Sequence, residues 1–298
     1  MKRLRGVTPS AGQPALTARG LTTVHGDATV HGDATVLDGV ELSVLQGEVF
    51  ALLGPAGAGK TAVVELLSAR VSADGGEAHA GGGPREAAVA ASAPVGVMGR
   101  SSAADGTLTV RENLLRAAEP HGLDGTEARR RCDELLLGCG LAGAAGQRAD
   151  ALSRAALRGL DLAMTLMGRP GVLLLDEPTA DLDPHERRTL WDVISGLAAD
   201  GVTVFLTTRY LEEAERLADR VALLDGGRIV AEDTAEALLR RVSEGRPRLV
   251  FADTNALEAA DGLLRLHRGP GGPPRPPPDG RRRGQRGAGR RRGPGGAR

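Results

Sequence analysis

The sequence lacks any apolar run long enough to cross a membrane. Its continuous apolar stretches, such as 172–175 and 202–206, fall far short of the ~20 residues that a span requires. The basic residues within 1–8 are not followed by an apolar stretch, so we expect no secretory signal. These absences favour a cytoplasmic protein, and any membrane role then comes through a partner.

Cysteine and lysine are scarce as well. The two cysteines, Cys132 and Cys139, have no Cys or His partner close by in sequence, so they form no zinc or disulfide pattern. We interpret them as reduced thiols that pack in the interior. Lys2 and Lys60 are the two lysines among 38 basic residues, and all the others are arginine. A chain so poor in lysine that still has one at position 60 suggests that this position requires it.

The formal net charge of zero conceals an asymmetry. Residues 268–298 hold ten arginines and one acid, Asp279, whereas residues 1–267 hold 28 basic and 37 acidic side chains. Large apolar residues are missing from 268–298, so nothing there offsets the entropy of ordering, and we predict disorder. A functional tail of this kind attracts nucleic acid or anionic lipid. Because a GC-rich gene read out of frame yields the same composition, we favour a non-functional extension.

The folded part opens with a duplication. Residues 24–35 read VHGDATVHGDAT, a six-residue tandem copy that is too short for a repeat protein. We predict a lengthened loop between strands at 16–24 and 35–45. Residues 72–94 are rich in glycine and alanine and specify no clear element.

Strand-like and helix-like patterns then alternate. Apolar runs predict strands at 49–53, 172–175, 202–207 and 221–224. Helical patterns occur at 61–71, 110–141, 184–198 and 211–218. This alternation is typical of an α/β fold with a parallel sheet, and the segment at 110–141 predicts a mostly helical insert.

The clearest motif follows the strand at 49–53. Residues 54–61 match G-x-x-x-x-G-K-[ST], in which successive backbone N–H groups face the phosphates of a nucleotide. We expect Lys60 to reach the β- and γ-phosphates and the Thr61 hydroxyl to hold Mg²⁺, while the helix that begins there directs its positive end at the anion. The predicted nucleotide-binding residues of this segment are Gly54, Pro55, Ala56, Gly57, Ala58, Gly59, Lys60, Thr61 and Ala62.

A second chemical element follows the strand at 172–175, which ends on two carboxylates. We expect Asp176 to coordinate Mg²⁺ through water, and Glu177 to orient or deprotonate an attacking water. Two neighbouring acids on a surface helix are the alternative. The four apolar residues before them and Pro178 after them argue against it.

These segments together resemble the ATP-binding-cassette (ABC) family. GEVFALLGPAGAGKT at 47–61 is similar to its Walker A motif, and LLLDEPTADLD at 173–183 to its Walker B motif and D-loop, whose acid is Asp183. LTVRENL at 108–114 and the segment 206–230 are similar to the daunorubicin-resistance type of drug-export ATPase subunit. The resemblance implies two cassettes paired head to tail around two ATP molecules, driving a separate membrane permease.

Four motifs depart from the family's pattern. By resemblance, the adenine-stacking aromatic corresponds to His31 and the Q-loop glutamine to Arg100. The signature LSGGQ, which contacts the partner's γ-phosphate, reads LSRAA at 152–156 and retains Ser153. Arg209 stands where the switch histidine is expected. We count Arg100 and Arg209 among the predicted nucleotide-binding residues, together with His31.

These departures weaken the groups that sense the γ-phosphate. Arg154 puts a charged side chain where glycine permits close backbone approach to phosphate. Arg100 offers no carbonyl oxygen to Mg²⁺, and Arg209 cannot act as an acceptor like a neutral histidine, although it can clamp a phosphate charge. Each lost transition-state contact costs on the order of tenfold to a thousandfold in rate. We therefore predict that nucleotide binding persists while hydrolysis is slow.

The remaining polar and aromatic residues receive ordinary structural interpretations. Trp191 and Tyr210 are expected in packing rather than in ligand binding. Charged residues within 129–131 and 212–220 are expected on solvated helix faces. The histidines without repeated spacing or acidic company are interpreted as surface residues, and these are His79, His121, His185 and His267.

The predicted fold is α/β, a P-loop NTPase of the ABC ATPase type, with a parallel sheet core, an N-terminal antiparallel layer and a helical subdomain. The predicted limits are an N-terminal tail at 1–15, a nucleotide-binding domain at 16–245 with its helical subdomain at about 103–166, a short extension at 246–267 and the disordered tail at 268–298.

The predicted function is that of an ATP-binding subunit that uses ATP and Mg²⁺ to drive export of a drug-like compound. Its predicted partners are a second ABC subunit, identical or different, and a separate permease that holds it on the inner face of the cell membrane. No specific nucleic acid is expected. The alternative is a catalytically impaired module that binds nucleotide to regulate a partner, against which the intact Glu177 argues. A cassette protein acting on ribosomes or DNA is disfavoured because neither a second cassette nor a coiled-coil insert is visible.

Overall fold

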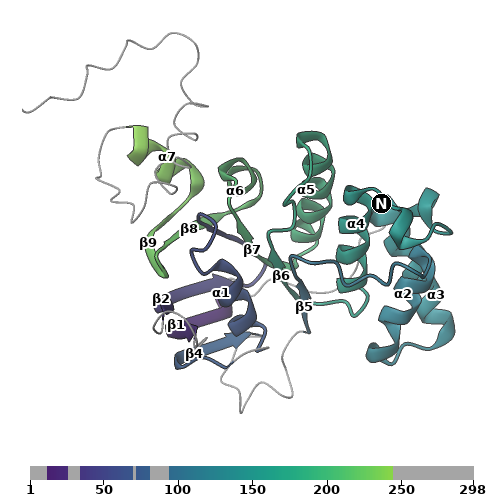
Figure 1. The fold of residues 1–298 in the computed structure, drawn as a ribbon, viewed down its shortest axis with the longest axis horizontal. Coiled ribbons are helices and arrows are strands. Elements are labelled where there is room, and N and C mark those ends of the chain that lie inside the picture. The colour runs from purple at the N-terminus through teal and green to yellow at the C-terminus, as the bar shows by residue number, and fades with distance from the viewer. Residues whose placement is uncertain (1–11, 26–33, 70–71, 81–93, 244–298) are drawn as a thin grey trace, which may run out of the picture.

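The structure is a computed structural model, and it describes residues 12–25, 34–69, 72–80 and 94–243. Figure 1 shows the arrangement of its strands and helices. The strands are β1 (Pro14–His25), β2 (Ala34–Leu45), β3 (Val49–Leu53), β4 (Gly75–Ala80), β5 (Val95–Met98), β6 (Val172–Asp176), β7 (Thr203–Thr208), β8 (Arg220–Asp225) and β9 (Arg228–Asp233). The α-helices are α1 (Lys60–Leu67), α2 (Val110–Ala118), α3 (Gly125–Gly138), α4 (Arg154–Thr165), α5 (Pro184–Ala199), α6 (Leu211–Leu217) and α7 (Ala235–Ser243).

Six strands form the central sheet in the order β5-β6-β7-β3-β8-β9. The first five are parallel to their neighbours, which confirms the predicted α/β fold with a parallel core. Strand β9 is antiparallel to β8 and was not predicted. It is joined to β8 by Gly226 and Gly227, whose φ values of 52° and 76° suit a tight two-residue hairpin turn.

A second, antiparallel sheet has the order β2-β1-β4 and confirms the predicted N-terminal layer. Strands β1 and β2 lie where the sequence predicted them, but β4 lies within 72–94, where no element was predicted. Its sequence GGEAHA lacks an apolar alternation, and it forms by pairing with β1. Gly76 has a φ of 82°, and a Cβ there would lie 2.3 Å from the backbone oxygen of Gly20, so the pairing requires glycine.

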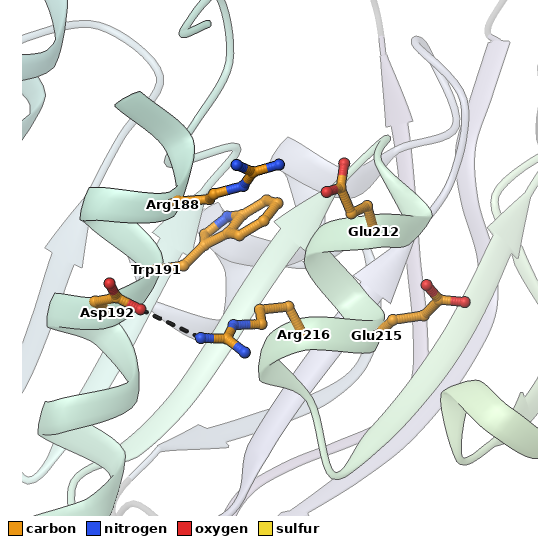
Figure 2. Close-up of a pocket in the computed structure, with 6 residues that line it drawn as sticks. All are labelled: Arg188, Trp191, Asp192, Glu212, Glu215 and Arg216. Atoms are coloured by element: carbon orange, nitrogen blue, oxygen red, sulfur yellow. Dashed lines mark hydrogen bonds and ion pairs between the residues drawn. The ribbon is translucent and has the colours of Figure 1, made fainter. Parts of the chain in front are cut away.

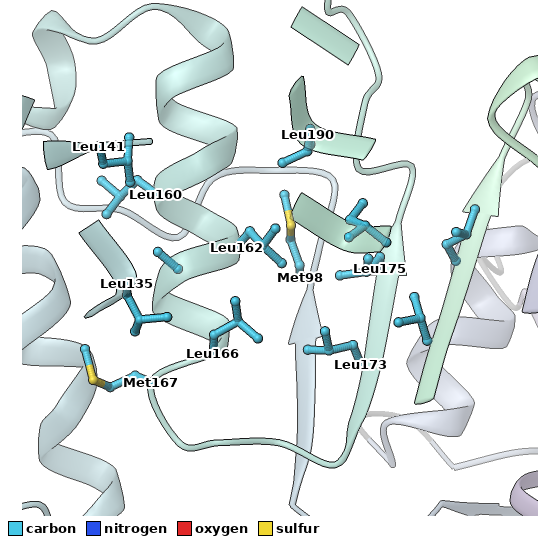
Figure 3. Packing of buried hydrophobic residues seen from close by; sticks show 14 of the residues in the cluster. Met98, Leu135, Leu141, Leu160, Leu162, Leu166, Met167, Leu173, Leu175 and Leu190 are labelled. Atoms are coloured by element: carbon cyan, nitrogen blue, oxygen red, sulfur yellow. The ribbon is translucent and has the colours of Figure 1, made fainter. Parts of the chain in front are cut away.

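Both faces of the central sheet are buried. Alternate residues of β6 point to opposite sides, so Leu173 and Leu175 join the core beneath α4 and α5 while Leu174 joins the core shared with α1 and the antiparallel sheet. Figure 3 shows the first of these cores, in which Leu162 of α4 and Leu166, the residue after its end, pack near Met98 and Leu173. This double covering explains the unbroken apolar runs that predicted the strands.

Two charged residues lie away from the solvated helix faces predicted for them, although Arg129, Arg130 and Glu212 beside them are exposed as predicted. Arg131 was expected on a wet face of α3, but it is 5% exposed and donates to the backbone oxygen of Leu166 at 2.9 Å. Glu213 was expected on the solvated face of α6, but it is 1% exposed. Both side chains bind groups of other elements, which a helical charge pattern cannot reveal, while Arg131 Nε and Glu213 Oε2 have no hydrogen bond among the described residues.

One helix limit also differs. The pattern predicted a helix over 61–71, whereas α1 ends at Leu67 because Ala69 adopts a φ of 54°, outside the helical region. Helices α2, α3 and α4 lie together at one end of the molecule, beyond β5 (Figure 1).

Several predictions fall outside the described residues. They concern His31, His267, the loop at 26–33, the extension at 246–267 and the basic tail at 268–298. The domain limits likewise stay predictions. Among the helices that the structure describes, none combines the length and apolar character of a membrane span.

Candidate functional site

Three glycines shape the loop between β3 and α1. Gly57 and Gly59 have φ values of 79° and 102°, which residues with a Cβ rarely adopt. A Cβ at Gly54 would lie 2.4 Å from the backbone oxygen of Leu224, and one at Gly59 would lie 2.9 Å from that of Val36. The loop is therefore held against β8 and β2, and its backbone remains close to the start of α1, whose free N–H groups can face an anion.

The Lys60 side chain is 4% exposed and lies under this loop. Its ammonium donates to the backbone oxygens of Gly54 at 2.8 Å and Pro55 at 2.7 Å, and it lies 3.2 Å from Oε1 of Glu177. Burial lowers the pKa of Lys60, and the charge of Glu177 opposes that shift. The ammonium is thus positioned between the loop and a buried carboxylate.

The other predicted loop residues surround this position. Ala58 and Lys60 are buried, Pro55, Gly59, Thr61 and Ala62 are half-buried, and Ala56 and Gly57 are exposed at the tip of the loop. The tip of the loop is therefore in contact with solvent, while Lys60 beneath it is not.

Asp176 lies at the carboxyl end of β6, directly opposite the first turn of α1. Its Oδ2 accepts a hydrogen bond from Thr61 Oγ1 at 2.8 Å, and its Oδ1 accepts one from Thr207 Oγ1 at 2.6 Å. Mg²⁺ prefers oxygen ligands and is commonly held by one or two carboxylates together with phosphate oxygens. The hydroxyl and carboxylate oxygens gathered here fit that donor set.

Glu177 occupies a tight turn after β6 with a φ of 44°. Its backbone N–H donates to Thr207 Oγ1 at 2.9 Å, and its side chain is 6% exposed. Besides Lys60, the carboxylate meets Arg100, whose guanidinium lies 3.4 Å from Oε2, and Arg209, whose Nε lies 4.0 Å from the same oxygen. Oε2 accepts no hydrogen bond from the described residues. Three cations therefore surround one buried carboxylate.

Arg209 extends this cluster to the next turn. Its guanidinium lies 3.5 Å from Asp181, which has a φ of 62°, and 5.3 Å from the centre of the Tyr210 ring. Arg187 stacks on the same ring at 4.3 Å. The Tyr210 ring thus packs against two guanidinium groups, in accord with the packing role predicted for it.

Two other predicted residues serve as helix caps in this structure. Ser153 is exposed and accepts a hydrogen bond from the backbone N–H of Ala156 at the start of α4. Asp183 accepts one from the backbone N–H of Glu186 in a capping box at the start of α5. Neither is in contact with the Lys60 cluster in the hydrogen bonds and ion pairs of the described residues. Their predicted roles toward a nucleotide stay predictions.

The sequence interpretation missed three residues that organise the site. Thr207 holds both Asp176 and the backbone of Glu177, and Glu213 accepts hydrogen bonds from Thr179 at 2.7 Å and from Trp191 at 2.9 Å. The third, Arg158, is buried on α4. The sequence does contain a signal for Arg158. It precedes Leu162 and Leu166 at helical spacing, so it is a charged residue on an otherwise apolar stripe.

A hollow of about 490 Å³ lies between α5 and α6, away from Lys60. Trp191 lines it, and Figure 2 shows Asp192 and Arg216 paired between the two helices, at 3.4 Å. The remaining lining residues are Arg188, Glu212 and Glu215. None of these belongs to the predicted nucleotide-binding set.

The chain is similar to proteins that bind ATP. The family described as ABC transporter matches residues 37–180. The daunorubicin resistance ATP-binding protein DrrA3 of Streptomyces coeruleorubidus is 42% identical over 232 residues, covering 77% of this chain and 73% of that protein. The daunorubicin/doxorubicin resistance ATP-binding protein DrrA of Streptomyces peucetius is 37% identical over 234 residues, covering 76% of this chain and 69% of that protein. A dimeric ATP-binding cassette solved in a post-hydrolysis state with ADP and Pi has the same fold, with a TM-score of 0.65 at 21% identity over 74% of this chain and 98% of that one.

Proposed function

Because this chain belongs to the ABC transporter family of ATP-binding subunits, we propose that it binds Mg·ATP at the loop 54–61 and hydrolyses it slowly to drive export of a drug-like compound through a separate permease. The observation that carries the proposal is the meeting of two segments. Lys60 and Thr61 of the loop are in contact with Glu177 and Asp176 at the carboxyl end of β6. Phosphoryl transfer needs this combination of a phosphate cradle, a metal ligand and a water-orienting carboxylate.

Each group has a specific role in this proposal. The backbone N–H groups of the loop and Lys60 hold the phosphates, and Thr61 and Asp176 hold Mg²⁺, which offsets the charge that develops on the phosphoryl group. Glu177 accepts a hydrogen bond from the attacking water. Its Oε2, which has no hydrogen bond from the described residues, is the atom available for that bond.

The drug-like cargo rests on the relatives, whose names assign them to daunorubicin or doxorubicin resistance. Partners in the proposed assembly are a second cassette, identical or different, and a permease at the inner face of the cell membrane. Ser153 and Asp183 then act across the cassette interface, and both are exposed at helix starts, where a partner can reach them.

A second candidate function is a nucleotide-binding module without turnover. The arrangement around Glu177 favours it, because Arg100 and Arg209 form ion pairs with the carboxylate that compete with an attacking water. Arg154 adds to this by placing a charged side chain next to Ser153, where the family has glycine.

The two candidates differ in a direct measurement on the purified protein. Binding of Mg·ATP and steady-state phosphate release are compared between the unsubstituted chain, Lys60→Ala and Glu177→Gln. Turnover that both substitutions abolish supports the ATPase. Binding that disappears in Lys60→Ala, with no turnover above that of Glu177→Gln, supports the module without turnover. Unchanged binding in Lys60→Ala contradicts both.

Export is tested in cells that carry the chain together with its permease. Loss of resistance to daunorubicin in the Lys60→Ala strain supports the proposed cargo class. Resistance that is equal with and without the chain contradicts it, even where the purified protein hydrolyses ATP.

A further inference from the structure

Arg158 joins three segments of the chain that lie far apart in sequence. It stands on α4 with its side chain 10% exposed. Its Nε donates to the backbone oxygen of Pro178 at 3.1 Å, and its Nη2 to that of Glu177 at 3.4 Å. Its Nη1 donates to the backbone oxygens of Gly99 at 3.0 Å and Arg100 at 3.2 Å. One guanidinium therefore binds the turn after β6 and the turn after β5 at once.

Asp161, one turn further along α4, completes the connection. Its Oδ2 lies 3.4 Å from Arg158 Nη1, and its Oδ1 accepts hydrogen bonds from Ser102 Oγ at 2.7 Å and from the backbone N–H of Ala103 at 3.0 Å. Burial raises the pKa of Asp161, and its hydrogen bonds oppose that shift. The segment 99–103 is thus held by α4 at both of its ends.

The turn that Arg158 binds is an unfavourable one for the backbone. Glu177 and Asp181 both have positive φ, at 44° and 62°, although neither is glycine. Such conformations persist when surrounding contacts hold them. The rigid, planar fork of arginine donates in several fixed directions, which suits it to binding the carbonyl groups of two separate segments.

We propose that Arg158 is a positioning residue for the site. It holds the turn that carries Glu177, so that the carboxylate lies next to Lys60, and it holds the turn that carries Arg100, so that this arginine lies next to Glu177. The inference rests on the proposed function, since it concerns the carboxylate to which we assign the attacking water. Arg158 itself does not touch the nucleotide. Its effect passes through the backbone of the two turns that carry Glu177 and Arg100.

The alternative is that Arg158 contributes only to the stability of the fold, through its buried ion pair with Asp161. Arg131 provides a matched control, because it is also a buried arginine, on α3, and it donates to the backbone oxygen of Leu166. It has no bond to either turn in the described residues. Loss of either guanidinium leaves buried carbonyl oxygens without a donor, but only the loss of Arg158 reaches Glu177.

The first test is amide hydrogen exchange, which requires neither nucleotide nor turnover. In Arg158→Gln we expect exchange to become at least tenfold faster in peptides that contain 99–103 and 177–182, where the amides of Ala103, Glu177, Ala180 and Leu182 are hydrogen-bonded. Arg131→Gln is expected to leave both peptides unchanged, and Arg158→Lys to give an intermediate result. Unchanged protection in Arg158→Gln, or equal acceleration in Arg131→Gln, overturns the proposal.

The second test separates binding from turnover. Arg158→Gln should lower kcat at least tenfold while the Kd for ADP changes less than twofold, and Arg158→Lys should recover part of kcat. An equal loss of ADP affinity and kcat contradicts a positioning role. Absence of turnover in the unsubstituted protein counts against the proposed hydrolysis alone, and the exchange measurement then decides the role of Arg158.

Discussion

The Nζ atom of Lys60 lies 3.2 Å from Oε1 of Glu177, so the loop after β3 and the turn after β6 are joined by a buried ion pair. Both side chains are less than a tenth exposed. In this setting the ammonium is a strong donor for phosphate oxygens, because little water competes with it. Removing Lys60 therefore affects both the ligand and the carboxylate.

Substitution of Lys60 by alanine should weaken ATP binding on the order of ten- to a hundredfold, because a hydrogen bond to a charged group contributes about 1.5–3 kcal/mol. Titration calorimetry with Mg·ATP measures the change. Lys2→Ala, which removes the same charge from the terminus, is the control and should bind as the unsubstituted chain does. Equal affinities for all three proteins would contradict the role assigned to Lys60.

Asp176→Asn should remove the benefit that Mg²⁺ gives to ATP binding. In the unsubstituted protein we expect a higher affinity for ATP with Mg²⁺ than with EDTA. In the variant the ratio of these two affinities should be at least about tenfold smaller, since a neutral amide is a poorer ligand for a hard cation. Thr207→Val leaves the carboxylate but removes its 2.6 Å hydrogen bond, so a smaller loss is expected. An equal Mg²⁺ effect in Asp176→Asn would place the metal elsewhere.

Replacing Arg100 by glutamine and Arg209 by histidine should increase turnover. The two guanidinium groups lie 3.4 Å and 4.0 Å from Glu177 Oε2, where they compete with the attacking water. We expect kcat of the double variant to increase about tenfold or more, at the low end of what a single transition-state contact contributes. Arg116→Gln, which removes an exposed arginine paired with Asp105, is the control. A loss of ATP affinity without a gain in kcat would show that the two arginines bind the phosphate instead.

Glu213 should make the free energy of unfolding depend on pH. Burial raises the pKa of this carboxyl, so the folded state holds more protons than the unfolded state between the two pKa values. The stability that protonated Glu213 contributes is fully present below the pKa of this carboxyl in the unfolded state. It is lost as the pH rises through the pKa of the carboxyl in the folded state. The stability of the unsubstituted chain should therefore fall relative to that of Glu213→Gln as the pH rises above the ordinary pKa of a glutamate carboxyl, about 4.3.

Glu213→Ala should be less stable than Glu213→Gln at every pH, because Thr179 and Trp191 lose their acceptor at a cost of about 1–3 kcal/mol. Guanidinium unfolding followed by the fluorescence of Trp191, the sole tryptophan, measures both effects. A pH-independent difference between the unsubstituted chain and Glu213→Gln would argue against the raised pKa.

The thiols should react slowly in the folded protein. Burial raises the pKa of Cys139 to about 12 and also raises that of Cys132, so very little thiolate is present near neutral pH. Modification by a disulfide reagent should be about a hundredfold or more slower than in the protein unfolded by guanidinium. In Cys139→Ser only Cys132 can react, so comparison with the unsubstituted chain assigns each phase of the modification to one thiol. A thiol that reacts equally fast in both states would contradict the packing interpretation.

Much of the fold follows from local sequence patterns. The unbroken apolar runs of β3 and β6 reflect burial on both faces, and Asp183 with Glu186 forms a capping box that a short segment specifies by itself. Strand β4 was not predictable in this way, because its residues gain their structure from pairing with β1 rather than from their own pattern.

The sequence by itself determined the chemistry of the site, because the loop motif and the acids after β6 depend on residue type and spacing over a few positions. The tertiary structure alone decided how these groups meet. It placed Arg100 and Arg209, separated by more than a hundred residues, against one oxygen of Glu177, and it buried Arg158 and Glu213 as partners of distant backbone and side-chain groups. Parallel strands bring their carboxyl ends to one edge of the sheet. Contacts at that edge therefore depend on the order of the strands and on the helices that pack against the sheet, and a local sequence pattern specifies neither.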